Sequence, residues 1–152
     1  MRIIDYEPRY QPEFKRINVA WIQKSFVVED VDLEVLDRPE ENILARGGHI
    51  LLALLGEEVA GTCALITSGP GVYQLVKMAV GERFRGLGIG RALCEAMIER
   101  AGQLGATKVM LYSNTRGSTR ALELYRKLGF REWPLPTQAY RRADIYMELE
   151  VF

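Results

Sequence analysis

The chain has 152 residues, of which 48% are hydrophobic and 26% are charged, a composition typical of a soluble globular protein. Its 20 acidic residues balance its 20 basic residues, so no overall charge favours nucleic acid or an anionic membrane as a partner. This length suits one domain, and we expect residues 1–152 to form it.

The N-terminal residues and the cysteines bear on the compartment. Asp5 and Glu7 interrupt the place where a secretory signal has its apolar run, so we expect no signal peptide. The longest apolar run, residues 50–55, is too short to span a bilayer. Cys63 and Cys94 fall inside expected regular elements, which favours reduced thiols and a cytoplasmic location. With one histidine and no Cys/His cluster, we expect no metal site.

The first half of the chain predicts a strand, two helices and three further strands. Apolar residues recur at mostly helical spacing through residues 11–26. The acidic stretch 29–41 predicts a second short helix broken before Pro39, because the residue before a proline avoids the α conformation. Short apolar runs bounded by turn residues then predict strands. These strands are expected at residues 2–6, 49–56, 57–68 and 71–80.

The second half predicts helices that alternate with strands. From Gly88 to Leu104 the apolar side chains follow one helical face, and Gly105 ends that helix. A buried strand is expected at residues 107–112, a helix at 118–130 and a closing strand at 143–150. The expected order is β-α-α-β-β-β-α-β-α-β-β. It indicates an α/β (α+β) fold with a mixed sheet, built from hairpins first and crossover helices later.

A glycine cluster, "RFRGLGIGRA" at residues 83–92, lies between an expected strand and helix. Backbone amides and the helix dipole together bind anions at such a position, and glycine allows a phosphate to approach closely. A dinucleotide fingerprint is excluded because Arg91 stands where glycine or alanine is needed. A Walker loop is excluded because no Gly-Lys-Ser/Thr follows. Glycines alone leave a ligand-free helix start as the alternative.

Two segments together resemble the GNAT superfamily of acyl-CoA N-acyltransferases. Residues 85–90 match the Arg/Gln-x-x-Gly-x-Gly/Ala signature of that family, between a strand and a helix. Some thirty residues later, Asn114 follows a strand and precedes an Ala-x-x-x-Tyr helix that ends in Leu-Gly-Phe, similar to the second signature. Both signatures occur in order within residues 74–130. The resemblance implies a mixed, centrally splayed sheet flanked by helices.

The same resemblance implies acetyl-CoA as the cosubstrate. Its diphosphate would bind backbone amides of the glycine-rich segment, and its pantetheine arm would lie along the preceding strand, which usually carries a bulge. Backbone amides of that strand would then stabilise the carbonyl oxygen during transfer. The expected cofactor-binding residues are Met78, Ala79, Val80, Arg85, Gly86, Leu87, Gly88, Ile89, Gly90, Arg91 and Asn114.

The resemblance also implies a catalytic role for Tyr125, which matches a tyrosine that hydrogen-bonds or protonates the coenzyme sulfur. Taken only as a helix-face aromatic, Tyr125 is instead a core residue with a satisfied hydroxyl. Asn114 has an asparagine-based turn as its alternative. Arg91, Arg120 and Lys127 could reach a 3′-phosphate, or could simply be solvated charges.

The sequence does not identify a single residue as the general base. Several relatives carry a glutamate where this chain has Gln74, and glutamine cannot accept a proton from the amine. Base catalysis would then come from elsewhere, pass through water, or be unnecessary for an amine with a low pKa. Glu29, Asp30 and Glu34 are the alternative carboxylates, each with a surface charge as its simpler interpretation. His49 is expected to be a structural residue at the start of a strand.

The acceptor amine is ambiguous between two classes. The acidic stretch 29–41 would suit a cationic acceptor, whereas Tyr140, Arg141 and Arg142 in the late loop would suit one that carries a carboxylate. We therefore expect an N-acetyltransferase that acts on a primary amine of a small molecule or protein. The resemblance also implies a possible homodimer, because homodimers are common in the family. The alternatives are an acyl-CoA-binding sensor without turnover, favoured by Gln74, and transfer of a longer acyl group, decided by the space beside Met78.

Overall fold

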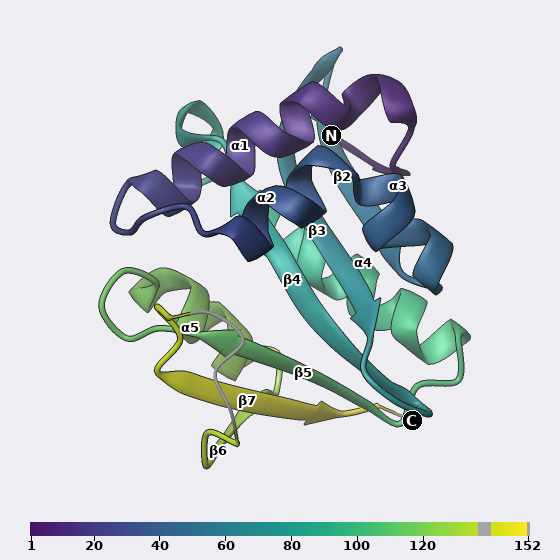
Figure 1. The fold of residues 1–152 in the computed structure, drawn as a ribbon, viewed down its shortest axis with the longest axis vertical. Coiled ribbons are helices and arrows are strands. Elements are labelled where there is room, and N and C mark those ends of the chain that lie inside the picture. The colour runs from purple at the N-terminus through teal and green to yellow at the C-terminus, as the bar shows by residue number, and fades with distance from the viewer. Residues whose placement is uncertain (137–140, 152) are drawn as a thin grey trace.

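The computed structural model describes residues 1–136 and 141–151. Within these residues, seven strands form one sheet in the order β1-β2-β3-β4-β5-β7-β6 (Figure 1). The parallel pair in this sheet is β4–β5, and the other neighbouring strands are antiparallel. The strands are β1 (Arg2–Asp5), β2 (His49–Leu55), β3 (Glu58–Thr67), β4 (Val72–Val80), β5 (Lys108–Ser113), β6 (Arg131–Trp133) and β7 (Ile145–Glu150).

The sheet splays apart between β4 and β5. These strands pair at only three positions, where Val72–Gln74 lie beside Lys108–Met110. Beyond Gln74 the two strands diverge, and Figure 1 shows the open angle between them. The predicted mixed and centrally splayed sheet is thereby confirmed.

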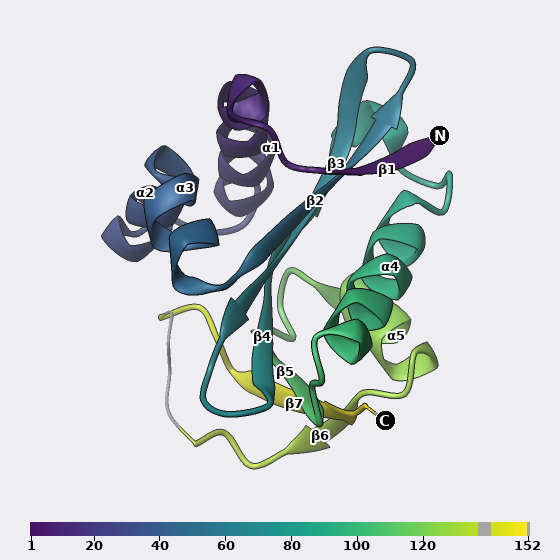
Figure 2. The ribbon, with the colours of Figure 1, turned by 90° about the vertical axis from the view of Figure 1, so that its right-hand side faces the viewer.

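Helices cover both faces of the sheet (Figure 2). The helices α1 to α3 lie on one face, and α4 and α5 lie on the other. Their bounds are α1 (Gln11–Gln23), α2 (Asp30–Asp37), α3 (Pro39–Asn42), α4 (Ile89–Gln103) and α5 (Thr119–Lys127), with short 3-10 turns at η1 (Pro8–Tyr10), η2 (Leu44–Arg46) and η3 (Glu82–Phe84). The element order matches the prediction, with one short helix added.

The added helix has a local cause. The acidic stretch 29–41 predicts one helix, but Arg38 adopts φ −135° and ψ 63°, so α2 ends at Asp37. Pro39 then stands in the first turn of α3, where its missing N–H costs nothing. The break before Pro39 is thus confirmed, and the residues after it form a helix of their own.

Each face of the sheet carries its own hydrophobic core. Because strand side chains alternate, the apolar run of β2 serves both cores: Ile50 and Leu52 pack toward α1, while Leu51 and Ala53 pack toward α4. A continuous apolar run is what a strand buried on both faces requires.

In β7 the expected alternation is wrong at one position. Tyr146 is predicted to be on the polar face, yet it is buried. Its ring packs against Tyr112 and its hydroxyl donates to Glu148 at 2.6 Å, so the polar end of this residue has a partner.

Cys63 and Cys94 are both buried free thiols. In the part of the chain that the structure describes, no helix has the length and apolar character needed to cross a membrane.

Candidate functional site

A bulge in β4 lies at the centre of the site. Thr62 of β3 pairs with Ala79, but Ala64 pairs with Val76, so two residues of β4 lie opposite one residue of β3. The extra residue is at Lys77–Met78, and Lys77 has φ +52°, in the left-handed region. A bulge bends its strand and changes the direction of the groups that follow. The bulge expected on this strand is present, just beyond the last residue that pairs with β5.

The glycine-rich segment connects the end of β4 to α4. Gly86 and Gly88 both have φ +78°, a conformation that side-chain-bearing residues rarely adopt. Gly88 is the N-cap of α4, and the first amides of that helix have no partners within the helix itself. Gly90 has an ordinary φ, and the nearest atom to a Cβ added there would be Val80 Cγ2 at 3.6 Å. The first two glycines are therefore required by the backbone, and the third is not.

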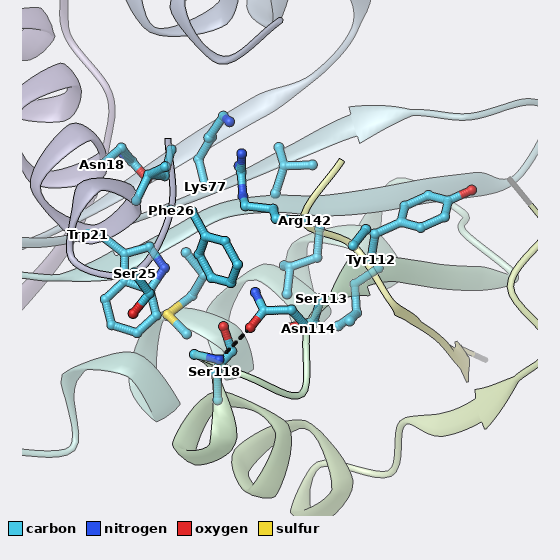
Figure 3. A pocket seen from close by; sticks show the side chains of 18 of the residues that line it. Asn18, Trp21, Ser25, Phe26, Lys77, Tyr112, Ser113, Asn114, Ser118 and Arg142 are labelled. Carbon is cyan, nitrogen blue, oxygen red and sulfur yellow. Dashed lines mark hydrogen bonds between the residues drawn. The ribbon is translucent and has the colours of Figure 1, made fainter. Parts of the chain in front are cut away.

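A cavity lies where the sheet splays (Figure 3). One side is formed by α1 and the loop after it, with Trp21 and Phe26, and the other by the end of β5, with Tyr112 and Asn114. Met78 of the bulge also lines this cavity.

Tyr125 of α5 lines the same cavity and is 7% exposed. Its ring packs edge-on against Phe130, with 5.7 Å between ring centroids. Burial raises the pKa of the Tyr125 hydroxyl well above its usual value, so this group keeps its proton at neutral pH. The structure thus supports both descriptions of Tyr125: a packed core aromatic and a cavity residue with a proton to donate.

Asn114 follows β5 and also lines the cavity. Its Oδ1 accepts a hydrogen bond from the Gly117 N–H at 2.7 Å, which forms the turn that leads to α5. The asparagine-based turn is therefore present, and it holds the Asn114 side chain at the cavity wall.

A family comparison identifies this arrangement. The model of the Acetyltransferase (GNAT) family matches residues 13–130, which contain the bulge, the glycine-rich segment, Asn114 and Tyr125. The chain belongs to the GNAT acetyltransferase family.

Individual GNAT relatives agree with this assignment. An uncharacterised N-acetyltransferase of Bacillus subtilis (strain 168) is 33% identical over 66% of this chain and 66% of its own length. N-acetyltransferase 8B of Rattus norvegicus is 30% identical over 72% of this chain and 51% of its own. The chain therefore spans between half and two thirds of these relatives.

Solved GNAT structures share the fold. An acetyltransferase of Staphylococcus aureus Mu50 superposes with a TM-score of 0.90 at 23% identity, with 99% of both chains covered. A Bacillus subtilis acetyltransferase in complex with CoA superposes with a TM-score of 0.75 at 24% identity, again with 99% of both chains covered.

The other predicted cofactor residues of this GNAT chain lie in the glycine-rich segment or just before it. Ala79 and Val80 continue β4 beyond the bulge, paired with β3 on one side. Arg85 stacks over the Trp21 ring at 5.2 Å, at one border of the cavity. Leu87 is exposed and Ile89 is buried as the first residue of α4.

The basic residues proposed for a 3′-phosphate lie on exposed helix surface. Arg91 is 3.6 Å from Glu95, one turn along α4. Arg120 and Lys127 are exposed on α5. Exposed positions such as these are compatible both with contact to a 3′-phosphate and with simple solvated charges.

None of the described residues that line the cavity is an aspartate or a glutamate. Gln74 lines it, at the position where a glutamate was considered as a base. Asp30 and Glu34 are exposed and lie outside the lining, and the Glu29 carboxylate is 3.1 Å from Arg142. His49 contacts Arg100 at the start of β2, outside the cavity lining. The structure therefore does not bring the candidate bases to the cavity.

Asp32, which the sequence analysis did not single out, is the most buried charge of the site. Its side chain is fully buried, with Oδ1 2.6 Å from Lys77 Nζ and 2.8 Å from an Arg142 nitrogen. Burial by itself raises the pKa of this carboxyl, but hydrogen bonds from Arg142 and the charge of Lys77 outweigh burial and lower that pKa from 3.8 to about 2. Lys77 and Arg142 line the cavity, and Asp32 binds both. Tyr140, proposed beside Arg142, lies outside the described residues.

Proposed function

We propose that the chain transfers an acetyl group from acetyl-CoA to a primary amine of a small molecule or a protein. The observation that carries this proposal is one continuous arrangement along β4: a bulge and an unpaired strand edge lead directly to a left-handed glycine segment at the start of a helix.

The glycine-rich segment would hold the diphosphate of the coenzyme. Gly86 and Gly88 leave the backbone uncovered, since an added Cβ at either would meet no atom within 4 Å. The N-terminus of α4 supplies amides and a partial positive charge to the same place. The pantetheine arm would lie along β4 beyond Gln74, where β4 has separated from β5 and its outer edge can accept a further strand-like partner.

In the transfer step, the amine nitrogen attacks the thioester carbonyl carbon. The new C–N bond forms, the C–S bond breaks, and the sulfur leaves as a thiolate that takes up a proton. Amides of Met78 to Val80 would stabilise the carbonyl oxygen, because their dipoles are fixed before the reaction begins. Tyr125 would supply the proton, since its hydroxyl is buried, protonated and at the cavity.

The proton released by the amine nitrogen would leave to solvent, and the Tyr125 oxygen would regain a proton from solvent. None of the described cavity residues is a carboxylate, so a neutral amine is the species expected to react. This arrangement supports an acceptor whose amine has a low pKa, or a pH optimum above neutrality.

A thiol-release assay across a panel of amines tests the proposed function. Purified protein, acetyl-CoA and one amine at a time should release CoA thiol only with productive amines, and mass spectrometry should detect the amine with one added acetyl group. Binding of acetyl-CoA without amine-dependent thiol release would instead favour the sensor alternative, which no observation on the fold presently supports.

A further inference from the structure

The bulge of β4 has an unusual residue at its turning point. In a bulge whose first residue is left-handed, that residue is normally glycine, because a Cβ is disfavoured there. Here it is Lys77, at φ +52°. Among the residues that the structure describes, Lys77 is the only non-glycine residue with a positive φ. Strained conformations of this kind persist only when the surroundings hold them, and they cluster at functional sites. Contacts of both its side chain and its backbone hold Lys77 in this conformation.

The side chain of Lys77 is held from the face of the sheet that carries α1 to α3. Its ammonium lies 2.6 Å from Asp32 Oδ1, with 4% of the Lys77 side chain exposed. Asp32 itself is fixed twice: its Oδ2 accepts the Glu29 N–H at 2.9 Å at the start of α2, and both its oxygens bind Arg142. A glycine at position 77 could not make this ion pair.

The backbone of Lys77 is held by a separate chain of hydrogen bonds. The Thr62 hydroxyl donates to the Lys77 carbonyl oxygen at 2.8 Å. Asn18 Nδ2 donates to the Thr62 hydroxyl oxygen at 3.0 Å and to the Phe14 carbonyl at 2.9 Å. The Thr62 oxygen accepts the hydrogen bond from Asn18, and its one hydroxyl hydrogen is donated to the Lys77 carbonyl oxygen. Asn18 and Thr62 are both buried, so water does not compete for these bonds.

We propose that Asp32 and Thr62 are positioning residues for acetyl transfer: together they hold Lys77 in the left-handed conformation and thereby aim the Met78 amide at the cavity. This inference rests on the proposed function and extends it to residues that need not touch either substrate. Lys77 and Met78 point to opposite faces, since Lys77 reaches α2 whereas Met78 packs with the core under α4. The Lys77 carbonyl and the Met78 N–H belong to the same planar peptide, so a rotation of that peptide would turn both groups together.

The competing explanation is that these contacts only stabilise the fold. The variants Thr62→Val and Thr62→Ser separate the two explanations, because valine has the shape of threonine without the hydroxyl, whereas serine keeps it. Ile50→Val is the matched control: it removes one buried methylene from β2, outside the cavity lining, and lowers stability without touching Lys77.

The experiment has two readouts. The first is kcat at saturating acetyl-CoA and amine, together with the Kd of CoA. We expect Thr62→Val to lower kcat about tenfold or more, a partial loss of an oxyanion donor, while the Kd of CoA changes less than about threefold. Thr62→Ser should recover kcat to within about threefold of the wild type, and Ile50→Val should leave kcat unchanged.

The second readout is the Met78 amide resonance in a ¹⁵N–¹H spectrum, which does not require turnover. In the wild type, acetyl-CoA should shift this resonance more than CoA does, and Thr62→Val should abolish the difference. An unchanged difference in Thr62→Val, or none in the wild type, would overturn the positioning role. A wild-type difference that Thr62→Val abolishes, without thiol release from any amine, would instead contradict the proposed function while still showing that Thr62 directs the Met78 amide toward the bound acetyl group.

Discussion

Single residues in this GNAT chain take on roles that their types alone do not reveal. Gly88 and Gly105 both have a left-handed backbone, at φ +78° and +82°, and neither has an atom within 4 Å of an added Cβ. They differ in place, because Gly88 begins α4 in the glycine-rich segment and Gly105 follows the other end of that helix. Substitutions of these two glycines therefore distinguish the effect of backbone strain from an effect on coenzyme binding.

We predict that Gly88→Ala weakens acetyl-CoA binding, whereas Gly105→Ala does not. Both variants should lose about 1–2 kcal/mol of unfolding free energy, because alanine is disfavoured in the left-handed region. Only Gly88→Ala should also raise the Kd of acetyl-CoA, by about tenfold, which corresponds to about 1.4 kcal/mol. Calorimetric titration with acetyl-CoA and urea unfolding measure the two effects. Equal Kd values for the two variants would show that the glycine-rich segment does not bind the diphosphate.

Tyr125→Phe should separate binding from turnover. Phenylalanine keeps the ring that packs against Phe130, so we expect little change in melting temperature or in the Kd of CoA. The lost hydroxyl should lower kcat about 10²-fold, as expected when a general acid is removed. Steady-state thiol release measures kcat. A variant with wild-type kcat would return Tyr125 to a purely structural role.

The pH dependence of kcat/KM should follow the acceptor amine. None of the described cavity residues is a carboxylate that could take its proton, so the neutral fraction of the amine should set the rate. We expect the midpoint of the pH profile to move with the pKa of the amine across a series of related acceptors. A midpoint that stays fixed for all amines would reveal an enzyme group acting as the base.

At the scale of elements, the loop before β7 and the start of α2 form one wall. Arg142 precedes β7 and binds both Asp32 and Glu29, which begin α2. Arg142 also lines the cavity, whereas none of the described residues 83–92 of the glycine-rich segment does. We therefore assign this wall to the acceptor rather than to the coenzyme.

Arg142→Gln should change the KM of the acceptor more than the Kd of CoA. We expect the acceptor KM to rise about tenfold, because α2 loses its link to the loop, and the Kd of CoA to stay within about twofold. Steady-state kinetics and calorimetry supply these values. Arg46→Gln, at an exposed position on η2, is the control for a lost surface charge. An equal loss of CoA affinity in Arg142→Gln would contradict the assignment.

The element pattern of this chain was largely predictable from its residues, whereas its bulge was expected only from the family resemblance. The spacing of apolar residues and the terminal glycines predicted α4 within one residue at each end. The position of the bulge could not be predicted from the residues, because Lys77 holds a conformation that sequence signals assign to glycine. Asp32 escaped because it lies in an acidic stretch where Glu29, Asp30 and Glu34 were equally plausible. Only the fold, which brings position 32 beside 77 and 142, distinguishes the buried carboxylate from its neighbours.

At the scale of the whole molecule, the buried ion cluster couples stability to pH. The pKa of Asp32 is about 2 in the folded chain, below its usual 3.8, so the ionised carboxylate stabilises the fold above about pH 4. This contribution, about 2 kcal/mol, is lost as the pH falls from 4 toward 2. Asp32→Asn should lose about 3 kcal/mol at neutral pH, because Lys77 and Arg142 then lose the buried carboxylate that both of them bind.

Urea unfolding between pH 2 and 7 measures this coupling. The wild type should show a steep fall in unfolding free energy below pH 4, and Asp32→Asn should show a shallower one. Parallel curves for the two proteins would mean that other carboxylates control the acid transition.

The splayed sheet and the glycine-rich segment together indicate that the molecule binds acetyl-CoA. Thermal unfolding with and without millimolar acetyl-CoA, on protein freed of bound ligand, tests this claim most directly. At 100 times the Kd, binding should stabilise the fold by about 2.7 kcal/mol, which raises the melting temperature by several degrees. An unchanged melting temperature would contradict the account and leave Gly86 and Gly88 with a structural role alone.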